Sequence, residues 1–153
     1  MSDEQTADPT SRTDPAPIDW RLAGFWLSSV AAIGLIIGGV APWAAYLGYW
    51  SVSGTHFHGW NDVAAGVLAL VMLGVHHQRR LQAPLLVAAV LGALAAIGAV
   101  MALAKIGSDG TITVFGVAYR YLNPDWGVYL VLASGIGLAC SATLTWLSAR
   151  GSG

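Results

Sequence analysis

The segment LQAPLLVAAVLGALAAIGAVMALA, residues Leu81–Ala104, contains no Asp, Glu, Lys or Arg. A charged side chain at the centre of a bilayer costs about 2.5–3.5 kcal/mol on insertion scales, and about 20 helical residues cross the hydrocarbon core. This segment therefore predicts a transmembrane helix. Two further apolar runs, at 22–42 and 126–149, predict two more, and the shorter run at 60–78 predicts a fourth if both its ends lie in the membrane interface.

The composition of the whole chain points to the same fold class. Of 153 residues, 56% are hydrophobic and only 10% are charged, whereas about a quarter of the residues in a soluble domain carry charge. The net charge of −1 comes without a basic patch, so nucleic-acid binding is excluded. We predict an all-α membrane protein, with a four-transmembrane-helix bundle over residues 21–150.

The first 20 residues are rich in Asp, Pro, Ser and Thr and lack an apolar run. Such a segment cannot bury enough surface to fold, which predicts a disordered cytoplasmic tail at 1–20. Basic residues near the span ends set the orientation, because cytoplasmic loops carry an excess of Lys and Arg. Lys105 and Arg120 fall on one side of a four-span arrangement. The other side, predicted to be cytoplasmic with both termini, carries Arg12, Arg21, Arg79, Arg80 and Arg150.

The two longer loops, about 43–62 and 105–125, should then face outward from the cytoplasmic membrane. Residues 50–58 alternate polar and apolar side chains, and 111–121 are rich in β-branched and aromatic ones. Both patterns are typical of strands. We expect a small extracytoplasmic β-sheet in which 50–58 pair with 111–121. Its expected interaction surface consists of Trp50, Phe57, Phe115, Tyr119, Arg120 and Tyr121.

Two histidines in the first outer loop raise the question of a metal site. His56 and His58 would share one face of a strand, and Asp62 follows at the start of the second helix. Zinc and copper sites need three or four ligands in tight geometry, so these residues are weak candidates. Asp62 is better explained as a charge that favours a helix N-terminus. We expect no cofactor and no catalytic residues. The hypothesis of an enzyme with an outward-facing site at His56, His58 and Asp62 has the least support.

Small residues recur within the predicted spans. Helices in lipid associate by close backbone approach rather than by burial of apolar surface. The glycines expected to permit this approach, in the bundle, in an oligomer or in both, are Gly34, Gly38, Gly66, Gly74 and Gly135. The single cysteine, Cys140, lies within the fourth run, and it excludes both an internal disulfide and a CxxC site.

Four short motifs carry a resemblance to known sequences. They are Gly39-Val-Ala-Pro-Trp43, Val52-Ser-Gly54, Gly59-Trp60-x-Asp62 and Asp125-Trp-Gly-Val-Tyr129. With these motifs the chain resembles a group of small four-span membrane proteins of high-GC actinobacteria, whose function is uncharacterised. The resemblance implies the same four helices and assigns no activity.

Two functions fit these observations. The first is a non-enzymatic accessory or interaction subunit, whose extracytoplasmic loops dock a membrane or envelope protein or a second copy of the chain. The alternative is a binder or carrier of a neutral or lipidic small molecule within the bundle. The ligand of such a protein would contact hydroxyl groups of the fourth helix, which carries Ser134, Ser141, Thr143, Thr145 and Ser148.

Overall fold

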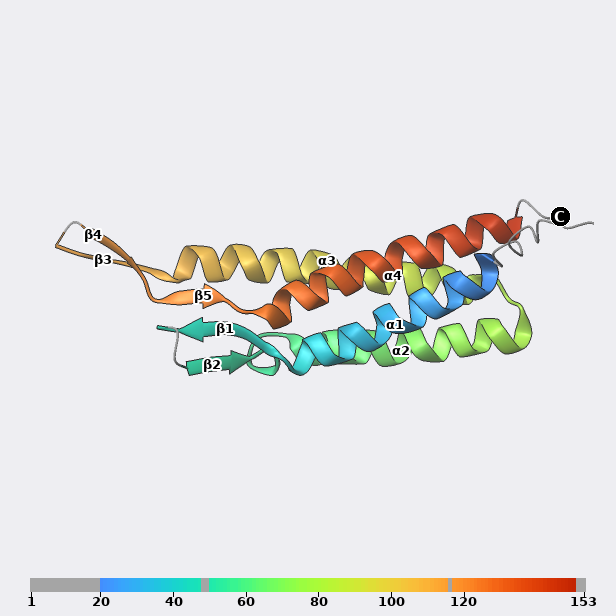
Figure 1. Ribbon diagram of the computed structural model, residues 1–153, viewed down its shortest axis with the longest axis horizontal. Helices are drawn as coiled ribbons and strands as arrows, with labels where there is room; N and C mark the ends of the chain where they lie inside the picture. Colours follow the sequence, from blue (N-terminus) through green and yellow to red (C-terminus); the bar gives the residue numbers. More distant parts are fainter. Residues whose placement is uncertain (1–19, 48–49, 116, 151–153) are drawn as a thin grey trace, which may run out of the picture.

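The computed structural model describes residues 20–47, 50–115 and 117–150. Four helices dominate it, and each is long and apolar enough to cross a membrane. They run side by side along the longest axis of the molecule (Figure 1) and comprise α1 Trp20–Val40, α2 Gly59–Arg79, α3 Ala83–Asp109 and α4 Trp126–Arg150. The prediction of four long apolar helices is confirmed.

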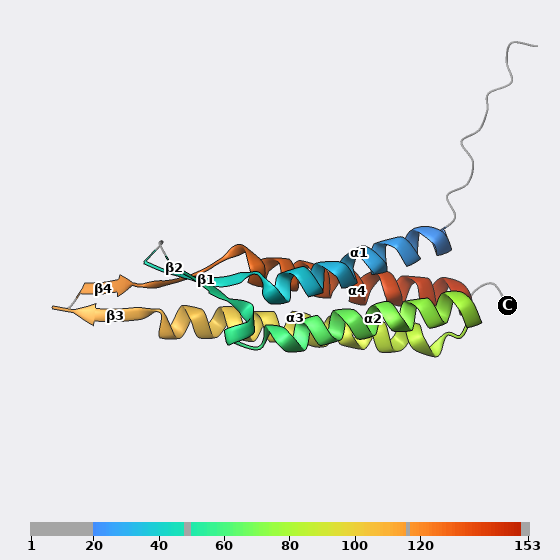
Figure 2. The same cartoon turned by 90° about the horizontal axis from the view of Figure 1, so that it is seen from below.

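Helix α3 continues to Asp109, past the expected end of its apolar run at Ala104. The charge of Lys105 limits burial in lipid, but lysine is a good helix former. The Ser108 hydroxyl donates to the Lys105 carbonyl oxygen at 3.0 Å, and the helix ends where the Gly110 N–H donates to the Ile106 carbonyl at 3.1 Å. The last turns of α3 therefore stand beyond the first turn of α2 (Figure 2).

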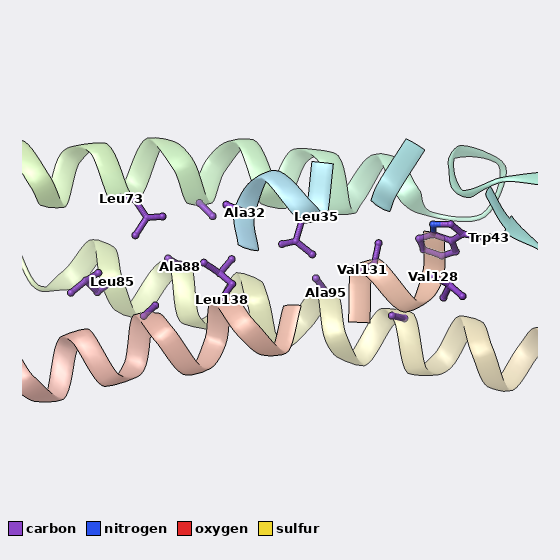
Figure 3. Close-up of a cluster of buried hydrophobic side chains, with 13 residues drawn as sticks. Ala32, Leu35, Trp43, Leu73, Leu85, Ala88, Ala95, Val128, Val131 and Leu138 are labelled. Atoms are coloured by element: carbon purple, nitrogen blue, oxygen red, sulfur yellow. The ribbon is translucent and has the colours of Figure 1, made fainter. Parts of the chain in front are cut away.

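Small and larger apolar side chains share the centre of the bundle, and further large ones cover its outside. The buried cluster in Figure 3 combines six alanines with seven larger residues and includes Ala32, Ala88, Ala95, Leu35, Val131 and Leu138. Large apolar side chains that are more than half exposed include Val30, Leu94, Ile97, Met101 and Leu144. The exposed large residues distinguish this bundle from a soluble one, whose outward face is polar and charged.

Glycines mark the closest approaches between helices α1 and α4. A Cβ added at Gly38 would lie 2.7 Å from a methyl carbon of Val131, and one at Gly34 would meet the side chain of Ser134. Helices α1 and α2 meet in the same way, because a Cβ at Gly66 would lie 2.7 Å from the carbonyl oxygen of Ala32. Close packing of α1 against both neighbours thus depends on missing side chains.

The contact between α3 and α4 is reciprocal. A Cβ at Gly135 would lie 2.7 Å from the carbonyl oxygen of Gly92, and a Cβ at Gly92 would lie 2.7 Å from the carbonyl oxygen of Gly135. Gly74 on α2 differs from the other glycines expected at helix contacts, since a Cβ there would meet no heavy atom within 4 Å. Its eight-residue spacing from Gly66 therefore does not bring it against a neighbouring helix.

The strands form two separate units at one end of the bundle. A three-stranded antiparallel sheet has the order β2-β1-β5 and consists of β1 Pro42–Tyr46, β2 Trp50–Ser53 and β5 Leu122–Pro124. A two-stranded hairpin projects beyond it (Figures 1 and 2) and consists of β3 Thr111–Val114 and β4 Val117–Arg120. The sheet joins both long loops, as expected.

The expected strand pairing in that sheet is wrong. Segment 50–53 pairs with 42–46, and 111–114 pairs with 117–120, so 50–58 and 111–121 do not pair with each other. Local hairpins close shorter loops and lose less chain entropy than a pairing between distant segments. Among the described strands, the pairing between distant parts of the chain is made by 122–124, which lies beside 42–46.

The two ends of the bundle differ in character. We call the end that carries β1–β5 the strand end. The opposite end holds the α2–α3 connection, the start of α1 and the end of α4 (Figure 1), and we call it the turn end.

Candidate ligand-binding groove

A groove of about 780 Å³ lies between α2 and α3 near the strand end. Its volume is in the range typical of small-molecule sites. One side is closed by the short 3-10 helix η1 Gly54–His56, which leads into α2. We call it the α2–α3 groove, and its lining includes His56, Phe57, His58, Asn61, Asp62, Ala65, Leu91, Leu94, Gly98, Met101 and Lys105.

One face of α3 supplies the apolar wall. Leu91, Leu94, Gly98 and Met101 recur at helical spacing and share that face. A Cβ at Gly98 would meet nothing within 4 Å, so the groove is open at this level. The small Ala65 lies opposite on α2. The space therefore arises because small residues stand where side chains could have filled the gap between the two helices.

The rim of the groove at the strand end is polar. It combines residues from η1, from the N-cap and first turn of α2, and from the last turns of α3: His56, His58, Asn61, Asp62 and Lys105. An apolar wall and a polar rim thus follow one another along the axis of the bundle. An amphipathic molecule has the same division between hydrocarbon and head.

Asp62 is the unusual member of this rim. Its side chain is 7% exposed, yet across the described ranges its carboxylate makes no hydrogen bond or ion pair with another residue. A carboxylate in the first turn of a helix gains about 0.3–1 kcal/mol from the helix dipole. Removing a charge from water costs several kcal/mol unless the charge is paired. In the part of the chain that the structure describes, no carboxylate oxygen of Asp62 is both fully enclosed and without a partner, so the carboxylate opens into the groove, where a ligand can reach it.

The η1 wall of the groove is held by a buried tryptophan. Trp43 on β1 is 2% exposed, and its Nε1–H donates to the Gly38 carbonyl oxygen at 2.8 Å. Its ring stacks on Phe57, with 6.2 Å between ring centroids and 15° between ring planes. The close approach of Gly54 to Trp43 leaves no room for a Cβ at that glycine. Phe57 is thereby fixed at the edge of the groove.

The residues expected as metal candidates do gather in this groove. His56, His58 and Asp62 all line it. In the part of the chain that the structure describes, however, no three His, Cys, Asp or Glu side chains are grouped closely enough to hold a metal ion.

The described residues of the expected interaction surface lie in different surroundings. Trp50 on β2 is 75% exposed and Phe115 at the hairpin tip is 102% exposed. Phe57 instead lines the groove, and the Tyr121 hydroxyl donates to the Asp109 carbonyl oxygen at 2.6 Å. The side chains of Tyr119 and Arg120 lie outside the described residues.

Four hydroxyls of α4 form hydrogen bonds within the bundle, those of Ser141, Thr143, Thr145 and Ser148. Ser28 and Ser141 share a buried hydrogen bond of 2.8 Å, and Thr143 and Thr145 donate to carbonyl oxygens one turn earlier at 2.7 and 2.8 Å. Ser134 contacts the α1 backbone at Gly34. A groove of about 880 Å³ between α1 and α4 is lined by Ser134, Ser141, Thr145 and Ser148, and the last three already form hydrogen bonds within the bundle.

Sequence reasoning missed Lys105 and the apolar wall on α3. The available signal was the spacing of 91, 94, 98, 101 and 105, which places Lys105 on the same helical face as the wall. This signal was overlooked because the helix was expected to end before Lys105.

No protein-family model, no curated protein and no solved structure matches the chain.

Proposed function

We propose that the chain is a multi-pass membrane protein whose α2–α3 groove binds an amphipathic, lipid-like molecule. The observation that carries the proposal is the spatial order of the lining residues: the apolar wall of α3 is followed by the polar rim at the strand end of the groove. The hydrocarbon of such a ligand would lie against Leu94 and Met101, and its head would lie at the rim. No catalytic step is part of this function.

Insertion of the bundle in a membrane is supported by its outer surface. Large apolar side chains are exposed on all four helices, whereas contiguous apolar patches on soluble monomers are limited to a few hundred Å². Charged residues lie toward the two ends, with Arg79, Arg80 and Arg150 at the turn end. By the excess of basic residues there, we place the turn end and both termini in the cytoplasm.

Cysteine labelling tests this topology. In a Cys140→Ser background, Gln82→Cys places a thiol at the turn end and Thr113→Cys places one in the strand-end hairpin, and both native side chains are exposed. A membrane-impermeant maleimide added to intact cells should label only the Thr113→Cys variant. Both should react after the membrane is permeabilised. Labelling of Gln82→Cys from outside would refute the orientation.

Lipid retention tests the groove. Purified protein is moved through lipid-free detergent, and the bound lipid that remains is measured by native mass spectrometry. Gly98→Leu places a large side chain in the open part of the groove and should remove most of this lipid. Gly74→Leu makes the same change on α2 where a Cβ would meet nothing within 4 Å, and it should retain the lipid. Equal retention by both variants would refute the proposal.

A second candidate function is docking of a membrane or envelope protein at the strand end. It is favoured by the exposure of Trp50 and Phe115 and by the projection of the β3–β4 hairpin beyond the sheet (Figure 2). Exposed aromatic residues are enriched at protein interfaces.

Site-specific photocrosslinking tests this docking. A photoreactive amino acid at Phe115 should capture a defined partner in cells, and the same amino acid at Cys140, which is exposed on the membrane-spanning surface of α4, serves as the control. Crosslinks to lipid alone at both positions would refute the docking function.

A further inference from the structure

The rim of the α2–α3 groove presents opposite charges from its two walls. Asp62 comes from the first turn of α2, and Lys105 comes from the last turns of α3. Across the described ranges no hydrogen bond or ion pair joins the Asp62 carboxylate to another residue, although its side chain is 7% exposed. A carboxylate on a nearly buried side chain, without a protein partner and open to the lining of a cavity, is complementary to a cation supplied by a ligand.

The aromatic part of the rim favours the same kind of ligand group. Phe57 and Asp62 line the same groove. The ring of Phe57 is held in place by stacking on Trp43. Aromatic faces attract ammonium groups, and the attraction is strongest where water is excluded. A carboxylate together with a fixed aromatic ring is a combination suited to an amine or a quaternary ammonium.

The rest of the rim suits an anion. Lys105 is exposed and carries three N–H donors, and lysine is a common partner of phosphate. His56 and His58 add further nitrogen atoms on the η1 side. An anionic head without an amine would leave Asp62 unpaired and would bring a like charge toward it.

We propose that the groove recognises the zwitterionic head of a phospholipid. The ammonium lies at Asp62 and Phe57, the phosphate lies at Lys105, and an acyl chain follows the wall formed by Leu91, Leu94 and Met101. This inference rests on the proposed function of the groove and adds the chemistry of the head. It excludes phosphatidylglycerol, which has a phosphate but no amine, as a preferred ligand.

The test is lipid competition in detergent micelles, measured by native mass spectrometry. Phosphatidylethanolamine, phosphatidylcholine and phosphatidylglycerol with identical acyl chains are offered in equal amounts. The wild-type protein should retain both zwitterionic lipids over phosphatidylglycerol by about tenfold, the effect expected of one charge-assisted hydrogen bond from phosphatidylethanolamine to Asp62, or of the charge attraction and cation–π contact that the quaternary ammonium of phosphatidylcholine makes in its place. Asp62→Asn should abolish the preference. Asp109→Asn removes an exposed carboxylate of α3 that does not line the groove, and it should keep the preference.

Lys105→Gln is a second variant, chosen because the exposed side chain does not contribute to the core. It should lower retention of phosphatidylethanolamine severalfold while leaving retention of a long-chain alkylamine, which lacks phosphate, unchanged. Persistence of the preference in Asp62→Asn would overturn the inference, as would an unchanged phospholipid affinity in Lys105→Gln. Equal retention of all three lipids by the wild type, together with their loss in Gly98→Leu, would refute head recognition but leave the groove function standing.

Discussion

The reciprocal glycine contact between α3 and α4 gives the sharpest stability prediction. In Gly135→Ala the new Cβ would lie 2.7 Å from the Gly92 carbonyl oxygen and 2.8 Å from the Ala96 nitrogen. Carbon and oxygen normally approach to about 3.3 Å, so the two backbones must separate by roughly 0.6 Å. Overpacking of this kind costs about 1–3 kcal/mol.

Gly74→Ala is the matched control. Both substitutions replace a helical glycine and gain the same helix propensity, about 0.5–1 kcal/mol, but a Cβ at Gly74 meets nothing within 4 Å. The propensity gain cancels when the two variants are compared. We therefore expect Gly135→Ala to be less stable than Gly74→Ala by about 1–3 kcal/mol, the overpacking cost alone.

Reversible unfolding in mixed micelles, followed by circular dichroism, measures this difference. The double variant Gly92→Ala, Gly135→Ala should lose less stability than the sum of the two single variants, because the first substitution already opens the gap that the second needs. If Gly135→Ala and Gly74→Ala unfolded together to within about 0.5 kcal/mol, the close approach of α3 and α4 would not be tight, and the reasoning would be refuted.

Three further substitutions test individual interactions. Trp43→Phe removes the indole hydrogen bond and should lower the unfolding free energy by about 1–3 kcal/mol; an unchanged urea midpoint would contradict this. A double-mutant cycle with Ser28→Ala and Ser141→Ala should give a coupling of about 0.6 kcal/mol, the average for hydrogen bonds between membrane helices, and a coupling of zero would show that the hydroxyls do not interact. Arg80 caps the C-terminal end of α2 with a φ of 53°, so Arg80→Gly should stabilise the protein by about 1 kcal/mol. Arg79, the last residue of α2, is helical, so Arg79→Gly should destabilise the protein; thermal unfolding that changes equally in both variants would rule this out.

Hydropathy was sufficient to predict the four helices, because each segment by itself is long and apolar enough to form such a helix. The sheet was harder to predict. Residues 42–46 were assigned to the end of the first span and its loop, although they form the central strand β1. Their apolar character satisfies a helix end and a buried strand equally well, and only the pairing with 122–124 distinguishes the two.

The candidate groove was predicted in part. His56, His58 and Asp62 were identified as unusual, but as metal candidates rather than as the rim of a cavity. A groove depends on what is missing between two helices, here a side chain at Gly98, and the sequence does not show which glycines face a neighbour. Gly74 and Gly135 illustrate this, since similar sequence contexts place one in open space and the other against backbone.

Strand β1 is hydrogen-bonded on both sides, to β2 from its own half of the chain and to β5 from the other half. Helix α1 of the first half also packs along α4 of the second half. The two halves are therefore held together by non-covalent contacts as well as by the covalent connection at the turn end. Two polypeptides divided between Arg80 and Leu81 would still share a backbone ladder at one end and a helix interface along their length. Cohesion of the fold is thus independent of chain continuity at that position, which makes it the natural place to insert a tag or a reporter domain.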